Sequence, residues 1–161
     1  MMQKMIEEQR DLLARPVHPK FVKTDTNVRG KFTTGDYVKV MLNTIFGPDN
    51  WSHTILSGPE IIRLNESYAY AQVTVRLTVQ FANGQQVTHD DIGVWPLSAS
   101  KESTLDDTRP ERFETVTKAA ITDAVKGCSE YLGVCFRPLS DQDLETYLRA
   151  RQGAIDERTT S

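Results

Sequence analysis

The clearest pattern in the chain is a strict alternation of polar and apolar residues between positions 72 and 81. Val73, Val75, Leu77, Val79 and Phe81 alternate with Gln72, Thr74, Arg76, Thr78 and Gln80. A period of two places the apolar side chains on one face of a strand. This segment is therefore predicted to form a half-buried antiparallel strand, with further extended runs at 51–64 and 85–97.

The residues between these runs predict how the strands connect. Asn83-Gly84 separates the second run from the third, and this dipeptide tolerates the positive φ angles of a type I′ turn. We therefore expect the second and third strands to form a hairpin. A three-stranded meander has two open edges, which predicts side-by-side assembly of subunits and, where the rotation permits, closure into a ring.

Three other segments have the apolar spacing of helices. Residues 3–14 predict a short amphipathic helix, and residues 35–46 predict a second that is capped by Thr33 or Thr34 and ends at Gly47. Residues 108–132 predict the longest helix, with Thr108 and Glu111 as a capping box. Its predicted apolar stripe consists of Phe113, Val116, Ala120, Ala124, Cys128 and Tyr131.

The remaining segments complete the predicted architecture. Residues 17–34 predict a loose hairpin or an extended basic arm, and Ser140 begins a last helix that ends near Gly153. Helices segregated from one meander predict an α+β fold, in which the long amphipathic helix packs on a three-stranded antiparallel sheet. We expect one domain over residues 1–152 and a disordered tail at 153–161.

Composition narrows the class of protein. With 161 residues, 39% hydrophobic and 25% charged, the chain is long enough for a core and too polar for a membrane span or secretory signal. We expect a soluble, cytoplasmic protein with two reduced core thiols, Cys128 and Cys135. The formal net charge is −3, but residues 15–40 carry a local excess of basic residues. An uneven charge distribution of this kind favours one basic surface.

Signatures of catalysis are weak. The chain has no GxSxG, GxxxxGK[ST] or GxGxxG sequence, so we expect neither an enzyme nor a bound cofactor. His89-Asp90-Asp91 leaves a metal-dependent hydrolase open as the weakest alternative. The cations predicted on regular elements are Lys39, Arg76, Lys118 and Lys126, which together with the basic arm are expected to line one groove for phosphates.

Three blocks of sequence, in order and spacing, resemble the Rad52-type single-strand annealing family. They are FGPDNWSH, VTVRLTVQFANGQQVTHDDIG and KAAITDAVKGCSEYLG, and the similarity covers about residues 35–136. The resemblance implies an α+β fold that assembles into rings and holds single-stranded DNA in a basic groove. It also implies annealing of complementary strands without ATP or metal, in the recombination and repair of phages and bacteria.

The resemblance also implies roles for individual residues. Lys118 and Lys126 stand where the family places groove lysines that contact the DNA backbone. The chain departs from the family at Gly127, Glu130 and Ala82, where basic residues are usual. Arg29, Lys31, Lys39, Arg76 and Lys101 are predicted to compensate.

The sequence therefore predicts a ring-forming, ATP-independent single-stranded DNA-binding and annealing protein of a bacterial or phage-infected cell. The predicted partners are single-stranded DNA, further copies of the chain, and recombination or single-strand-binding proteins, with no membrane. The alternative is an oligomeric scaffold of the same fold that has lost DNA binding. The net charge of −3 and the missing basic residues favour that alternative.

Overall fold

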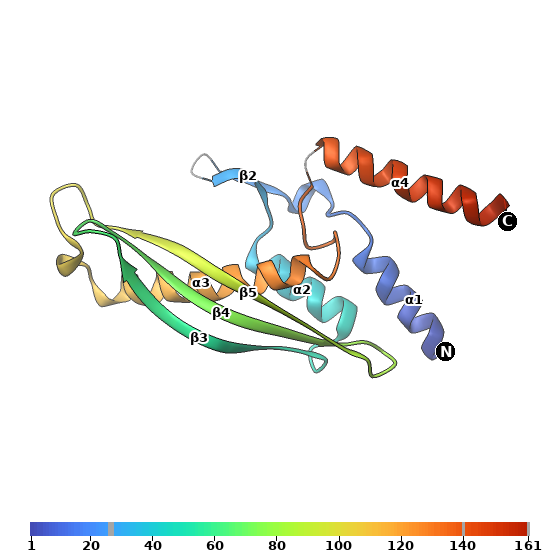
Figure 1. Cartoon of the computed structure of the whole chain (residues 1–161), viewed down its shortest axis with the longest axis horizontal. Helices are drawn as coiled ribbons and strands as arrows, with labels where there is room; N and C mark the ends of the chain where they lie inside the picture. Colours follow the sequence, from blue (N-terminus) through green and yellow to red (C-terminus); the bar gives the residue numbers. More distant parts are fainter. Residues whose placement is uncertain (26–27, 140, 161) are drawn as a thin grey trace.

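The main unit of the protein is a three-stranded antiparallel sheet in the order β3-β4-β5. In the computed structural model, which describes residues 1–25, 28–139 and 141–160, the strands are β3 (Trp51–Arg63), β4 (Tyr68–Gln80) and β5 (Gln86–Ser98). Helix α3 (Pro110–Glu130) runs along one face of the sheet (Figure 1). The predicted α+β architecture and its antiparallel meander are confirmed.

The core lies between β4 and α3, as the alternating pattern predicts. Every second residue of β4 from Ala69 to Val79 is buried, whereas the residues between them are partly or fully exposed. The facing residues of α3 are small, because Ala120, Ala124 and Cys128 are completely buried. Close packing of this kind leaves little free volume.

Gly93 of β5 marks the closest approach of the helix to the sheet. A Cβ atom at this position would lie 1.9 Å from the Ala120 carbonyl oxygen and 2.6 Å from the Ala124 nitrogen. Only glycine therefore allows the two backbones to meet at this point.

Helix α2 (Gly35–Phe46) lies beside the C-terminal half of α3 and the start of β3 (Figure 1). It begins as predicted, with Thr34 as the cap, because the Thr34 Oγ1 atom accepts a hydrogen bond of 3.2 Å from the Tyr37 N–H. Thr33 is instead buried. Gly47 ends the helix with a φ of 87°.

The N-terminal segments and the C-terminal helix lie at one end of the sheet (Figure 1). They comprise α1 (Met2–Leu13), the 3-10 turn η1 (Pro19–Phe21), the hairpin of β1 (Lys23–Asp25) and β2 (Val28–Phe32), and α4 (Asp141–Thr160). The predicted first helix and hairpin are confirmed. The Tyr147 hydroxyl of α4 donates a hydrogen bond to the Ala14 carbonyl after α1.

The predicted end of the last helix near Gly153 is wrong, because α4 continues to Thr160. A Cβ atom at Gly153 would meet no atom within 4 Å. No neighbouring group therefore forces the helix to end at this residue. Ser140, the predicted start, lies outside the described residues.

The turn between β4 and β5 also differs from the prediction. The hairpin itself forms, but Gly84 is the only turn residue with a positive φ, at 85°, and Asn83 does not adopt one. The Gly84 N–H donates to the Phe81 carbonyl over 2.8 Å, which closes a four-residue turn. The connection is therefore longer than a two-residue type I′ turn.

The capping box predicted at Thr108 and Glu111 is absent. Helix α3 begins at Pro110 with Arg109 as its N-cap, and no side chain caps it. A capping box forms instead at the short turn η2 (Leu105–Asp107). There the Asp107 carboxylate accepts a hydrogen bond of 3.2 Å from the Thr104 N–H. The stripe prediction fails at Tyr131, which is 64% exposed and stacks on His89.

Among the described residues, no helix combines the length and apolar character that crossing a bilayer would require.

Candidate nucleic-acid interface

Two of the predicted cations, Lys39 and Lys126, meet at a small cavity of about 60 Å³. The cavity lies where α2, α3 and the start of β3 come together. Its lining residues are Gly35, Val38, Lys39, Trp51, His53, Ile121, Thr122, Val125 and Lys126. We name this site the α2–α3 groove.

Close contacts hold α2 in place beside α3 and β3. A Cβ atom at Gly35 would lie 2.4 Å from the Thr122 Cγ2 atom, so the first turn of α2 rests against α3. The Trp51 Nε1 atom donates a hydrogen bond of 2.7 Å to Asn43 Oδ1, which links β3 to α2. The Tyr37 hydroxyl donates to the Cys135 carbonyl oxygen over 2.7 Å, beyond the end of α3.

Lys126 is partly buried, and an aromatic ring lies beneath its ammonium group. The Nζ atom is 5.6 Å from the centroid of the Phe32 ring, at the end of β2. A cation over an aromatic face is stabilised by the ring quadrupole. The hairpin therefore helps to position this lysine at the groove.

Acidic groups also lie near Lys126. Glu130 is one helical turn further along α3, and burial raises its pKa, although Arg137 and Lys126 oppose that shift. The Asp91 carboxylate occupies the space beside Gly127, because a Cβ atom there would lie 1.9 Å from Asp91 Oδ2. The missing basic side chain at position 127 thus coincides with a carboxylate.

Lys118 does not reach the groove lining. It lies eight residues before Lys126, about 12 Å along the axis of α3. Its ammonium group is 2.7 Å from the Glu114 carboxylate, and its side chain is 73% exposed. The hydrogen bond from Lys118 lowers the pKa of Glu114. Exposed pairs of this kind contribute little stability.

Arg76 lies on the opposite face of the sheet from α3. Two hydrogen bonds, of 2.8 and 3.0 Å, join its guanidinium to the Asp90 carboxylate on β5 and lower the pKa of that carboxyl. The prediction that Arg76, Lys39, Lys118 and Lys126 line one groove therefore does not hold within one chain. The period of two places Arg76 on the face that α3 does not cover.

The other predicted cations are dispersed. Lys101 is exposed in the loop between β5 and α3, at the far end of α3 from the groove (Figure 1). The side chain of Arg29 lies outside the described residues.

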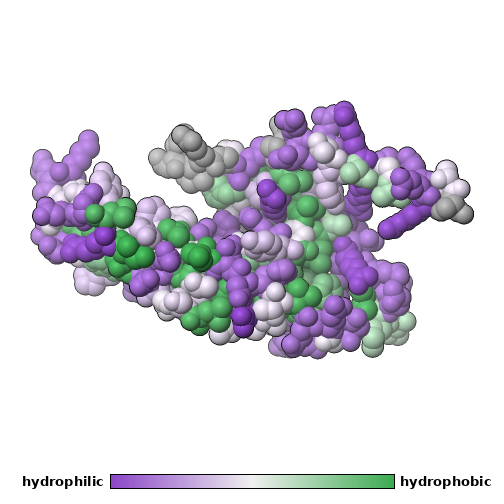
Figure 2. Space-filling model, viewed as in Figure 1, coloured by the Kyte–Doolittle hydropathy of each residue, from purple (hydrophilic) through white to green (hydrophobic). Residues whose placement is uncertain are grey.

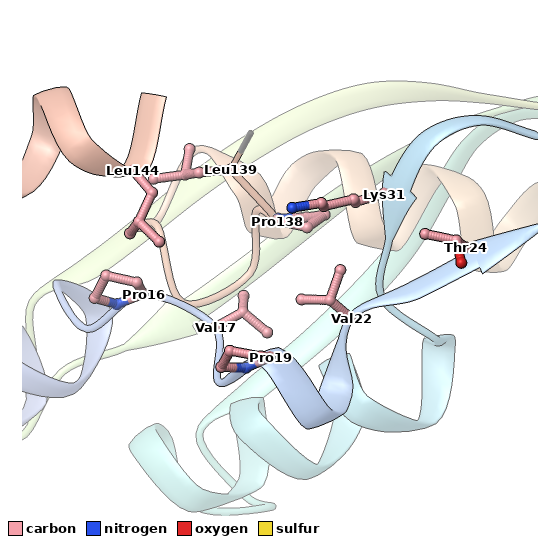
Figure 3. A pocket seen from close by; sticks show the side chains of 9 residues that line it. All are labelled: Pro16, Val17, Pro19, Val22, Thr24, Lys31, Pro138, Leu139 and Leu144. Atoms are coloured by element: carbon pink, nitrogen blue, oxygen red, sulfur yellow. The ribbon is translucent and has the colours of Figure 1, made fainter. Parts of the chain in front are cut away.

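Lys31 lines a second, larger cavity of about 250 Å³ near the hairpin (Figure 3). The lining comes from the segment after α1, from the hairpin and from the region where α4 begins. The residues are Pro16, Val17, Pro19, Val22, Thr24, Lys31, Pro138, Leu139 and Leu144. The cavity is mainly apolar and has one charged lining residue, so it lacks the paired cations of the α2–α3 groove.

His89 and Asp90 do not converge on a common site. The His89 ring stacks on Tyr131 of α3, with centroids 5.3 Å apart, whereas Asp90 pairs with Arg76 on the other face. Within the described residues, no three His, Cys, Asp or Glu side chains are grouped so that they could hold a metal ion. The geometry therefore gives the hydrolase alternative no support.

Trp51 and His53 are groove residues that the charge pattern missed. Both belong to β3 and lie on the same face of the strand, opposite Val79 and Leu77 of β4. Alternation from Trp51 could have placed His53 on the face that meets α3. The presence of α2 beside this face is what makes both residues part of a groove.

Comparison with known protein families matches residues 5–153 to the Rad52/22 family of double-strand break repair proteins. The chain belongs to this family. Membership places the protein in DNA repair and recombination and confirms the predicted resemblance, which rested on residues 35–136 alone. A search of curated protein sequences finds no match.

Proposed function

We propose that the protein binds single-stranded DNA in the α2–α3 groove and anneals complementary strands while assembled with further copies of itself. Membership of the Rad52/22 family supports a role in recombination and repair. The observation that carries the proposal is the convergence of Lys39 and Lys126 from two different helices at a groove that also contains Trp51.

The mechanism is electrostatic capture and contains no bond-making step. Lysines bind phosphates without reading sequence, and an aromatic side chain beside them offers a surface on which a base can stack. Lys126 and Lys39 provide the charge, and Lys118 extends it along α3 once it leaves Glu114. Bases turned away from these lysines are free to test a second strand for complementarity.

The backbone of the first turn of α2 adds to the positive potential, although this turn also carries the carboxylate of Asp36. Gly35 lies in the lining of the groove, and backbone N–H groups at a helix N-terminus favour anions. The Tyr37 N–H is already bonded to Thr34, so the remaining N–H groups of this turn are the ones that favour a phosphate.

The experiment is fluorescence anisotropy of a labelled single-stranded oligonucleotide, measured over a range of salt concentrations. We expect Lys39→Glu/Lys126→Glu to weaken binding and to reduce the salt slope by about 1.4, since each phosphate contact on a single strand contributes about 0.7. The control is Lys4→Glu/Arg10→Glu, which makes the same charge change on exposed residues of α1. An equal loss of affinity for the oligonucleotide in both variants would show that net charge, not the groove, governs binding.

A DNA-free oligomeric scaffold is the second candidate. The observations that favour it are the carboxylate beside Gly127 and the acids already paired with Lys118 and Arg76. Wild-type protein that fails to bind the oligonucleotide at low salt, while still forming oligomers, would replace the annealing proposal with the scaffold.

A further inference from the structure

The two faces of the β1–β2 hairpin have different surroundings. In the regular part of the hairpin, Lys23 lies opposite Phe32, and Thr24 lies opposite Lys31. Residues directly opposite each other in an antiparallel pair carry their side chains on the same face, and successive residues of a strand point to opposite faces. Lys23 and Phe32 therefore share one face, and Thr24 and Lys31 share the other.

The face of Thr24 and Lys31 belongs to the apolar cavity. Both residues line it, together with residues from the segment after α1 and from the region where α4 begins. In Figure 3 the Lys31 side chain extends from the hairpin toward Pro138. Lys31 is therefore not directed toward the α2–α3 groove, which lies on the side of the other hairpin face. Hydropathy varies sharply over this end of the molecule, where apolar and polar surface alternate (Figure 2).

The face of Lys23 and Phe32 is the one that meets the groove. Lys126 lines the groove, and its Nζ atom lies 5.6 Å from the centroid of the Phe32 ring. The Cβ atoms of directly opposite residues are about 4.5–5.5 Å apart, so the Lys23 side chain starts beside that ring. Phe32 thus brings together a lysine of α3 and a lysine of β1 that lie more than a hundred residues apart in the sequence.

Lys23 is available to bind an anion. Its side chain is exposed and forms no ion pair within the part of the chain that the structure describes. Lys118 and Arg76 differ in this respect, because each is already paired with a carboxylate. No existing ion pair has to be broken before Lys23 contacts a phosphate.

Lys23 also lies where the site is short of positive charge. The Asp91 carboxylate occupies the space beside Gly127, and Glu130 is close enough to Lys126 for the lysine to lower its pKa against the larger effect of burial. These acids offset part of the charge of Lys126. A second lysine beside the Phe32 ring adds to the positive potential at this point.

The residues predicted to compensate for the missing charge do not reach this place. Arg76 lies on the face of the sheet that α3 does not cover, Lys31 lines the apolar cavity, and Lys101 is at the far end of α3. Lys23 was not among the predicted residues, and only the register of the hairpin places it next to Phe32.

We propose that Lys23 is a phosphate-binding residue of the nucleic-acid site, and that a bound strand continues from the α2–α3 groove past Lys126 onto the hairpin. The inference rests on the proposed function and adds β1 and β2 to the elements that form the site. Lys126 and Lys23 bind two phosphates of one strand, on either side of the Phe32 ring.

The test compares two variants of the same hairpin, Lys23→Gln and Lys31→Gln. Both remove one positive charge, and the two residues lie in adjacent cross-strand pairs but on opposite faces. In the anisotropy assay with a labelled single-stranded oligonucleotide, we expect Lys23→Gln to weaken binding at low salt and to reduce the salt slope by about 0.7. Lys31→Gln should keep the wild-type slope. Lys23→Gln/Lys126→Gln should reduce the slope by about 1.4, because the two lysines contact different phosphates.

A second measurement locates the contact in the wild-type protein. Lysine side chains are acetylated with a water-soluble reagent in the presence and absence of the oligonucleotide, and the modified positions are identified by mass spectrometry. We expect the oligonucleotide to protect Lys23 and Lys126. Lys4, an exposed residue of α1, should react equally in both samples.

Three outcomes would overturn the proposal. Wild-type protein that does not bind the oligonucleotide at low salt would overturn the proposed function, and the role of Lys23 with it. Binding that depends on Lys39 and Lys126, while Lys23→Gln keeps the wild-type slope and Lys23 stays reactive, would overturn the role of the hairpin alone. Equal losses of affinity in Lys23→Gln and Lys31→Gln would show that the hairpin acts through its overall charge and not through the face toward Lys126.

Discussion

The two sides of helix α3 are packed in different ways. Toward β5, helix and sheet meet backbone to backbone at Gly93, and the Asp123 carboxylate bonds to the Val94 N–H. Toward α2 and β3, the contacts run through side chains, and a cavity of about 60 Å³ remains between two lysines. The first side is suited to fix the helix, and the second has the space and charge that a ligand needs.

This difference explains why the cations of α3 are not equivalent. Lys126 lies where three elements converge, and Phe32 contacts its ammonium group. Lys118 lies two turns earlier, where α3 has no such neighbour, and pairs with a glutamate of its own helix. Lys126 is therefore positioned by a second element, whereas Lys118 is positioned by a residue of its own helix.

The largest expected effect comes from Gly93→Ala. The added Cβ atom would meet the Ala120 carbonyl oxygen at 1.9 Å and the Ala124 nitrogen at 2.6 Å, and backbone atoms cannot move aside separately. We expect the free energy of unfolding, measured by urea denaturation, to fall by about 3 kcal/mol. Ala124→Gly in the same chain should not restore it, since the backbone atoms remain. A variant as stable as the wild type would show that the two backbones do not meet this closely.

A smaller effect is expected for Gly35→Ala on the opposite side of α3. Here the obstructing atom is the Thr122 Cγ2 methyl, at 2.4 Å. We expect a loss of about 1–2 kcal/mol, measured in the same way. Thr122→Ser removes the methyl and should recover most of the loss. If Thr122→Ser does not restore stability, the contact of α3 with α2 accommodates an added methyl group as poorly as the contact of α3 with β5.

The smallest effect is expected for Asp123→Ala, which leaves the Val94 N–H without its carboxylate partner. Because this N–H lies at an exposed edge and can bond to water, the loss should be about 1 kcal/mol. Asp123→Asn keeps an acceptor oxygen and serves as the control. Sedimentation should also detect new association of Asp123→Ala through its opened edge. If the Ala and Asn variants behave identically, the hydrogen bond from Val94 to Asp123 does not protect the edge of β5.

Predictions of elements from the period and from the residues that bound them were the most successful. The alternation in β4, the helix after Thr34 and the hairpin around Gly84 depend on residues close in sequence, and all three are confirmed. The type of turn and the capping box were wrong. In both cases a similar arrangement nearby forms instead. A longer turn also accommodates Gly84, and a Thr-Asp pair occurs at Thr104 and Asp107.

The predicted site was recovered only in part, because its residues lie far apart in the sequence. Lys39 and Lys126 are separated by more than eighty residues, and Arg76 lies between them in sequence but on the other face of the sheet. Charge on a regular element selected all three, and the family resemblance pointed to Lys126 as well. Charge carries no information about which face each side chain occupies once α3 covers the sheet.

The sequence by itself determined the elements, the buried face of β4 and membership of the Rad52/22 family, because these depend on the order and spacing of residues along the chain. The tertiary structure alone decided which cations share a groove and which edge of the sheet is closed. Those features depend on the packing of α2 and α3 against the strands, where Gly35 and Gly93 allow close approach and Asp123 reaches an N–H twenty-nine residues away.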